Sequence, residues 1–167
     1  VMNLRGVRES VVPLIPIMLA FVALHAFAIV YAVFAHAGNI PEVLEGTTQQ
    51  VSDTSSVVGI FGLLFLLLKS YSFGAGTYTG IEAVSNGLPV IREPRVENGK
   101  RTMKYMAISL AFMVTGLMVA YLLYHVEHAP GKTLNAVLFE SLSADWNPTV
   151  AKSFVLATLL SEAALLF

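Results

Sequence analysis

One short stretch of the sequence combines residue types that can bind a small polar ligand inside an otherwise apolar segment. Residues 71–87 read YSFGAGTYTGIEAVSNG, with several glycines and threonines and one glutamate. Glycine tolerates an unwound backbone, and a threonine hydroxyl can both donate and accept hydrogen bonds. We therefore expect a substrate-binding site here, formed by Gly74, Gly76, Thr77, Tyr78, Thr79 and Gly80.

Three titratable side chains in apolar surroundings are candidates for coupling or gating, namely Glu82, Lys69 and His25. Ionisable residues inside membrane spans are costly and are usually functional. Each has a simpler alternative role. Glu82 could cap a helix, Lys69 could extend its long side chain toward water, and His25 could be a hydrogen-bonded core histidine.

The segment needs a break because the apolar run that contains it is too long for one span. Residues 56–91 would form a straight helix of about 54 Å, against roughly 30 Å of hydrocarbon. An unwound backbone survives in lipid only where protein buries it or where it lines a wet cavity, and transporters use such breaks to hold substrates. We expect the break near residues 74–80. The alternatives are that the glycines allow close helix packing and that the threonines bond to carbonyls of their own helix.

The residues after the break predict a new helix. Glu82 follows Thr79 by three residues, which is the spacing of a capping box. The new N-terminus would offer N–H groups to an anion, and the helix ending near residues 71–73 would offer carbonyls to a cation. A zwitterionic amino acid fits both ends, whereas a bare cation fits one. Protonation of Glu82 would weaken the cap and loosen the broken segment.

The composition predicts an all-α membrane protein with the lipid bilayer as its main surroundings. The chain is 56% hydrophobic and 13% charged, whereas a soluble domain carries about 25% charged residues. Its net charge of −1 argues against nucleic acid as a partner, because nucleic acid attracts dense basic patches. His125 and His128 supply two metal ligands at most, so we expect no metal site. We also expect no cofactor and no enzymatic activity, because no catalytic cluster is visible.

The elements that must position these residues are membrane spans. A span needs about 20 apolar residues, and the sequence predicts spans at residues 11–35, 56–91 (broken near 74–80), 105–124 and 149–167, the last one truncated. We interpret residues 1–167 as a single transmembrane domain that is an internal piece of a longer protein. A short amphipathic helix is expected within residues 131–142, at the outer surface.

Basic residues in the connections predict the orientation. They lie in residues 1–10 and 92–104, and residues 36–55 contain none. The remaining connection, residues 125–148, has Lys132 alone. Basic loops stay cytoplasmic, so residues 1–10 and 92–104 are expected inside.

Two stretches carry a family resemblance: NLRGVRES at residues 3–10 and GTYTGIEAVSNGLPVIREPRVENGKRTM at residues 76–103. They resemble the amino acid–polyamine–organocation (APC) superfamily of permeases. That family commonly has a Gly-aromatic-Glu motif in its broken sixth span, and Gly80-Ile81-Glu82 holds the position here, with isoleucine for the aromatic residue. The resemblance covers nearly the whole chain, as roughly spans five to eight.

The resemblance implies a LeuT-like inverted-repeat transporter bundle in a bacterial or archaeal cytoplasmic membrane, completed by the rest of the transporter chain. It implies secondary active transport of a small-molecule substrate, with amino acid uptake coupled to protons or sodium as the preferred interpretation. Many of these permeases have a large aromatic residue near the position of Gly76, where this chain has small residues. The stretch is also similar to the superfamily's bacterial potassium importers, so potassium uptake is the alternative. A membrane sensor that does not transport is the third hypothesis.

Overall fold

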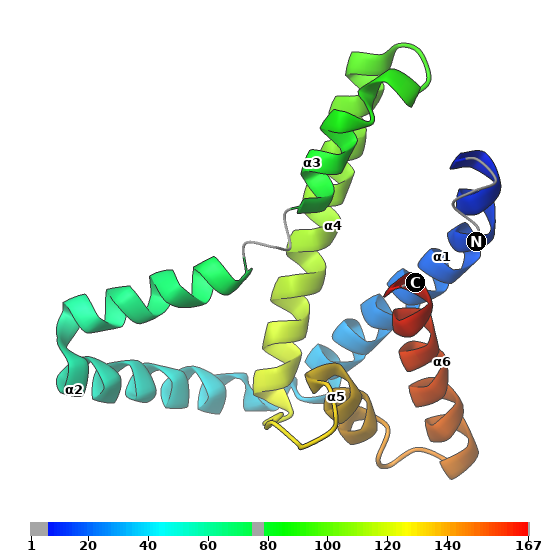
Figure 1. Cartoon of the computed structure of the whole chain (residues 1–167). Coiled ribbons are helices and arrows are strands. Elements are labelled where there is room, and N and C mark those ends of the chain that lie inside the picture. Colours follow the sequence, from blue (N-terminus) through cyan, green and yellow to red (C-terminus); the bar gives the residue numbers. More distant parts are fainter. Residues whose placement is uncertain (1–6, 75–78, 167) are drawn as a thin grey trace. The chain divides into compact units, whose positions relative to one another are not determined.

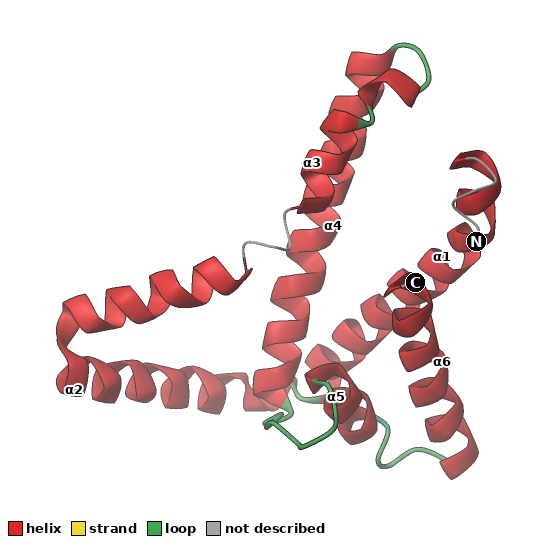
Figure 2. Ribbon diagram, viewed as in Figure 1, coloured by secondary structure: helices red, strands yellow, loops and turns green. Residues whose placement is uncertain are grey.

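The structure, a computed structural model, describes residues 7–74 and 79–166. Within this part, helices and connecting loops are present and no strand occurs (Figure 2). The α-helices are α1 (Val7–Ala35), α2 (Ile40–Gly74), α3 (Thr79–Asn86), α4 (Arg95–Leu123), α5 (Leu134–Leu142) and α6 (Pro148–Leu166). Short 3-10 helices are η2 (Ala37–Asn39) and η4 (Leu88–Val90). The predicted all-α class is confirmed.

Four helical segments of the described residues are long and apolar enough to cross a membrane (Figure 1). They are Leu14–Ala35, Ala37–Gly74, Arg95–Leu123 and Pro148–Leu165. Ala37–Gly74 and Arg95–Leu123 begin well before the predicted apolar runs, because the polar residues that precede those runs are themselves helical. Helix formation needs backbone hydrogen bonds and tolerates polar side chains, so hydropathy alone places these starts too late.

The chain divides into two compact units, which we describe separately. The first unit contains Val1–Ile40 and Thr115–Phe167, and the second contains Pro41–Val114. Helix α4 contributes its first part to the second unit and its last turns to the first unit.

In the second unit, α2 bends sharply at Gly59 (Figure 1). Gly59 has φ 71° and ψ 170°, a backbone conformation available almost only to glycine. It separates a polar first segment, residues 40–58, from an apolar second segment, residues 60–74. The sequence predicts one interruption in the run from residue 56 to residue 91, near 74–80, and the bend at Gly59 lies outside that stretch.

Beyond α3, the chain turns through η4 into the start of α4. The side-chain amide of Asn98 donates to the carbonyl of Arg92 at 2.9 Å. Gly99 of α4 lies so close to Leu88 that an added Cβ would stand 2.6 Å from the Leu88 Cδ1 atom. The absence of a side chain at Gly99 therefore lets η4 pack directly on α4.

The first unit contains the apolar core of the described residues. Helices α1, α5 and α6 pack against one another, and the end of α4 adds Ala120. The buried core residues are Ala28, Ala32, Ala120, Leu138, Phe139, Leu142 and Phe154. Small alanines on α1 and α4 allow close approach of the backbones, which is the usual way that helices associate in membranes.

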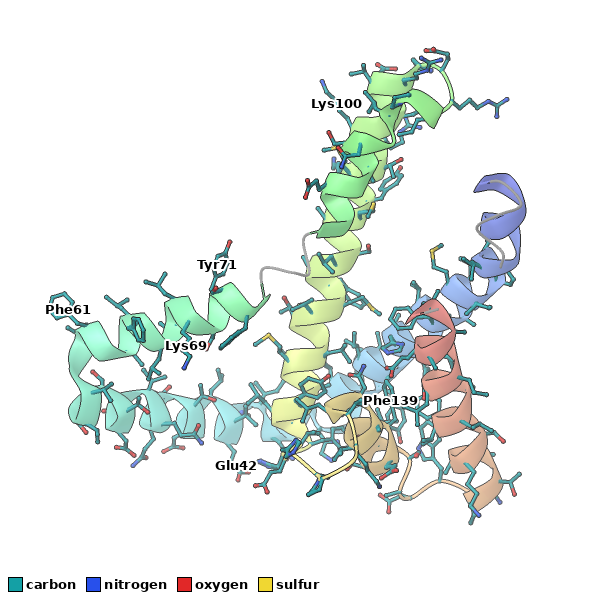
Figure 3. All side chains as sticks on the ribbon, viewed as in Figure 1. Glu42, Phe61, Lys69, Tyr71, Lys100 and Phe139 are labelled. Atoms are coloured by element: carbon teal, nitrogen blue, oxygen red, sulfur yellow. The ribbon has the colours of Figure 1, made fainter. Side chains whose placement is uncertain are left out.

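Helix α5 is the short amphipathic helix that the sequence predicts within residues 131–142. Thr133 caps it, because its hydroxyl accepts from the Ala136 N–H at 3.1 Å. Its apolar face is buried, and Phe139 reaches His25 of α1 and Phe154 of α6 (Figure 3). The helix is thus an integral part of the core of the first unit.

Candidate functional site

The predicted substrate site lies between two helix ends of the second unit. The described part of α2 runs to Gly74 and that of α3 starts at Thr79, so the predicted break near residues 74–80 stays a prediction. Gly76, Thr77 and Tyr78 lie outside the described residues. The assignment of these residues to a substrate site stays a prediction.

Glu82 lies in the first turn of α3, and its side chain is exposed. A carboxylate at this position favours the helix, because the N-terminal end carries a partial positive charge. Thr79 and Gly80 also belong to α3, but the Thr79 side chain lies outside what the structure describes. The capping box therefore stays a prediction, and so does the role of Glu82 in coupling.

Lys69 is exposed on the apolar second segment of α2, where it projects from the side opposite Tyr71 (Figure 3). Its Nζ atom stands 6.0 Å from the centre of the Phe73 ring, at the outer limit of a cation–π contact. Within the described residues Lys69 forms no ion pair. Its coupling role also stays a prediction.

His25 is the predicted site residue whose surroundings the structure gives most fully. Its side chain is completely buried in the first unit, and both ring nitrogens have partners. The Nδ1 atom stands 2.9 Å from the carbonyl oxygen of Phe21, one turn earlier in α1. The Nε2 atom stands 2.9 Å from Oε1 of Glu162 in α6. His25 is therefore a hydrogen-bonded core histidine, and its partner across the helices is titratable.

The polar contacts continue from Glu162 to two further helices. The side-chain amide of Asn135 in α5 donates to Oε1 of Glu162 at 2.6 Å. The hydroxyl of Tyr121 in α4 donates to the Asn135 side-chain carbonyl. Together His25, Glu162, Asn135 and Tyr121, called here the polar network, join four helices of one unit.

Sequence reasoning found one member of the polar network and missed the other three. A signal for Glu162 was present, because it is a lone carboxylate in the last apolar run, and such residues usually mark function. Asn135 and Tyr121 carry no comparable signal. Only the packing of α4, α5 and α6 brings them to Glu162.

Aromatic rings enclose the polar network. The His25 ring lies 4.1 Å from the Phe21 ring and 5.2 Å from the Phe139 ring, centre to centre. Nearby, the Trp146 indole N–H donates to the Tyr31 hydroxyl at 3.0 Å, and its ring packs on Phe154. The rings shield the imidazole from solvent. Electrostatic interactions and hydrogen bonds are stronger in surroundings of low dielectric constant.

A second histidine ring of the first unit lies just after α1. The His36 ring packs on Tyr124 at 4.2 Å between centres. Burial raises the pKa of the Tyr124 hydroxyl, and the nearby Tyr31 and Asp145 raise it further. Tyr124 therefore stays neutral across the physiological range.

No group of three or more potential metal-ligating side chains gathers among the residues that the structure describes. His125 and His128 are both exposed on the loop after α4. The one ion pair on the following segment joins Lys132 to Glu140 at 2.6 Å, with both side chains about half exposed.

The sequence is similar to the potassium transporter KimA of Bacillus subtilis (strain 168), with 36% identity over 135 residues. The match covers 80% of this chain and 21% of the relative, so the chain spans about one fifth of that protein's length. No protein-family model matches the sequence. No solved structure matches it significantly. With four helices among its described residues apolar enough to span a bilayer and a bacterial transporter as relative, the chain is an integral membrane protein of a bacterial cell membrane.

Proposed function

We propose that the chain is part of a secondary active transporter that takes up potassium. The observation that carries this proposal is the similarity of most of the chain to a potassium transporter. The family resemblance of the sequence favours amino acid uptake, with potassium uptake as the alternative. The relative favours the alternative, and nothing in the comparisons favours an amino acid substrate.

The chemistry of the predicted break agrees with a bare cation. Potassium is bound in proteins by oxygen atoms that replace its hydration shell, chiefly backbone carbonyls. The C-terminal end of a helix such as α2 carries a partial negative charge, which attracts a cation. In sequence, residues 74–80 contain two threonines and three glycines. We therefore propose that oxygens of this stretch hold the ion.

The proposal includes membership of the APC superfamily, a LeuT-like bundle and transport without catalysis. A transporter of this kind needs the lipid bilayer and the rest of its chain. The resemblance to the APC superfamily implies that the first span of the complete protein supplies the other half of the substrate site. Protons and sodium are the candidate coupling ions. Glu82, Lys69 and His25 are the candidate coupling residues.

The test is uptake by the complete protein in proteoliposomes. Rubidium, as a tracer for potassium, is compared with a panel of amino acids, each with and without a proton or a sodium gradient. We expect rubidium uptake that competes with unlabelled potassium and is unaffected by amino acids. Uptake of an amino acid without rubidium uptake would overturn the proposal in favour of the other substrate.

Isotope exchange separates a transporter from a sensor. Vesicles are loaded with unlabelled potassium, and labelled rubidium is added outside. A transporter exchanges the two across the membrane and accumulates label, whereas a sensor binds the ion and gives no exchange. Binding without exchange would end the transport proposal.

A further inference from the structure

The polar network determines where a hydrogen atom must lie on the His25 ring. The Nδ1 atom faces the Phe21 carbonyl oxygen at 2.9 Å. A carbonyl oxygen can only accept, so Nδ1 carries a hydrogen. In a neutral imidazole with that tautomer, the Nε2 atom has a lone pair and no hydrogen.

The second nitrogen then requires a further proton. Nε2 stands 2.9 Å from Oε1 of Glu162, and an ionised carboxylate oxygen is an acceptor only. Two acceptors at that distance repel each other. A proton must therefore lie between them, either on Nε2, giving imidazolium with carboxylate, or on Oε1, giving neutral imidazole with carboxylic acid. Both states contain the same single proton.

Asn135 and Tyr121 are compatible with both protonation states, and their hydrogen bonds fix the orientation of the Asn135 amide. The Tyr121 hydroxyl donates to the Asn135 side-chain carbonyl, so the Asn135 amide group faces Glu162 and donates to Oε1 at 2.6 Å. Oε1 can accept this bond whether it is ionised or protonated. The amide bond is made to Oε1 and the recorded partner of Nε2 is Oε1, so the proton between the ring and the carboxyl group is still required.

We propose that His25 and Glu162 form a buried binding site for one proton, and that this proton ties α1 to α6. The titratable groups that face the site are His25 on α1, Glu162 on α6 and Tyr121 on α4, while α5 contributes the neutral Asn135. The His25 side chain is 0% exposed and that of Glu162 is 19% exposed. The ring is thus shielded by the described residues, and the carboxyl group is largely shielded as well.

Loss of the proton is expected to weaken the contact between α1 and α6. As the pH rises and the pair releases its proton, the ring lone pair faces the carboxylate, and the contact between α1 and α6 becomes repulsive. The packing of these helices is then complete at lower pH and is weakened as the pH rises. The proton belongs to the pair, because interacting groups titrate together. This site does not depend on which ion the protein transports.

Hydrogen exchange measured by mass spectrometry on the complete protein in liposomes tests the proposal. The readout is exchange in residues 21–32 and 154–165 across a pH series, corrected for the intrinsic exchange rate at each pH. In the wild type we expect local exchange to rise by about 10- to 100-fold between the protonated and deprotonated pair, the range for loss of a hydrogen bond to a charged group. In Glu162→Gln, whose amide has no proton to lose, this rise should disappear.

Glu140→Gln is the matched control, since it removes a carboxylate of the same unit that pairs with Lys132 at the surface. It should keep the wild-type pH profile. A rise of equal size in the wild type and in Glu162→Gln would overturn the proposal, as would loss of the rise in Glu140→Gln.

A second measurement keeps the proposal testable if Glu162→Gln fails to fold. Nitrogen NMR of histidine in the wild-type protein reports each ring nitrogen, with His25→Gln used for assignment and His128→Gln as the matched histidine control. We expect Nδ1 of His25 to stay protonated at every pH, and the Nε2 signal to change as the shared proton leaves. A His25 ring with hydrogen on Nε2 alone would refute the site. Neither readout involves transport, so failure here is distinct from failure of the potassium proposal.

Discussion

Gly116 of α4 lies directly against Ile29 of α1. A Cβ atom built on Gly116 would stand 2.6 Å from Cγ2 of Ile29 and 2.9 Å from its Cδ1. Gly116→Ala should therefore force Ile29 or the helices apart and destabilise the protein by about 1–3 kcal/mol, the usual cost of overpacking. Thermal unfolding of the complete protein in detergent measures this change.

Two further variants separate packing from helix propensity. Gly46→Ala is the control, because nothing lies within 4 Å of the position of its Cβ, and alanine in a helix interior is favoured over glycine by roughly 0.5–1 kcal/mol. Adding Ile29→Ala to Gly116→Ala should cost less than the sum of the two single changes. Strict additivity would show that the two side chains do not compete for this space.

Gly59→Ala tests the bend of α2. Alanine strongly disfavours φ 71° with ψ 170°, so the change should cost about 1–3 kcal/mol or straighten the helix. Spin labels on the exposed Val51 and Leu67 measure the outcome. In a straight helix their backbones would lie about 24 Å apart, and we expect the label distance to rise toward that value. An unchanged distance with unchanged stability would contradict the assignment of the bend to glycine.

Thr133→Ala removes the N-cap of α5. Loss of the bond to the Ala136 N–H should weaken the helix by about 1 kcal/mol, which corresponds to roughly fivefold faster hydrogen exchange in α5. Thr48→Ala is the control, since the Thr48 hydroxyl donates to the Leu44 carbonyl on an exposed helix and caps nothing. Equal exchange in the two variants would exclude a capping role for Thr133.

Glu82→Gln tests coupling at the start of α3. The glutamine side chain keeps the size of the glutamate and removes its titratable proton. We expect rubidium uptake by the complete protein in liposomes to lose its dependence on pH. Glu127→Gln, on the exposed loop after α4, should keep that dependence. A pH profile of Glu82→Gln that matches the wild type would exclude Glu82 as the coupling group.

The sequence predicted the features that depend on local chemistry. Long apolar runs indicated membrane helices because a bilayer core accepts little else. The expected break near residues 74–80 stays a prediction, since residues 75–78 lie outside the described part of the chain. The short helix over 134–142 followed from leucine spacing. The bend at Gly59 was missed, because a single glycine in an apolar helix more often serves packing than bending.

The sequence by itself determined that this protein belongs in a membrane, that it is helical and that His25 sits in apolar surroundings. Tertiary structure alone decided which groups His25 meets. Glu162 lies 137 positions along the chain from it, and Asn135 and Tyr121 complete the network from two other helices. Hydropathy and helical spacing act over a few turns, whereas a hydrogen bond between helices depends on which faces pack together. That choice is made by side-chain packing across the whole unit.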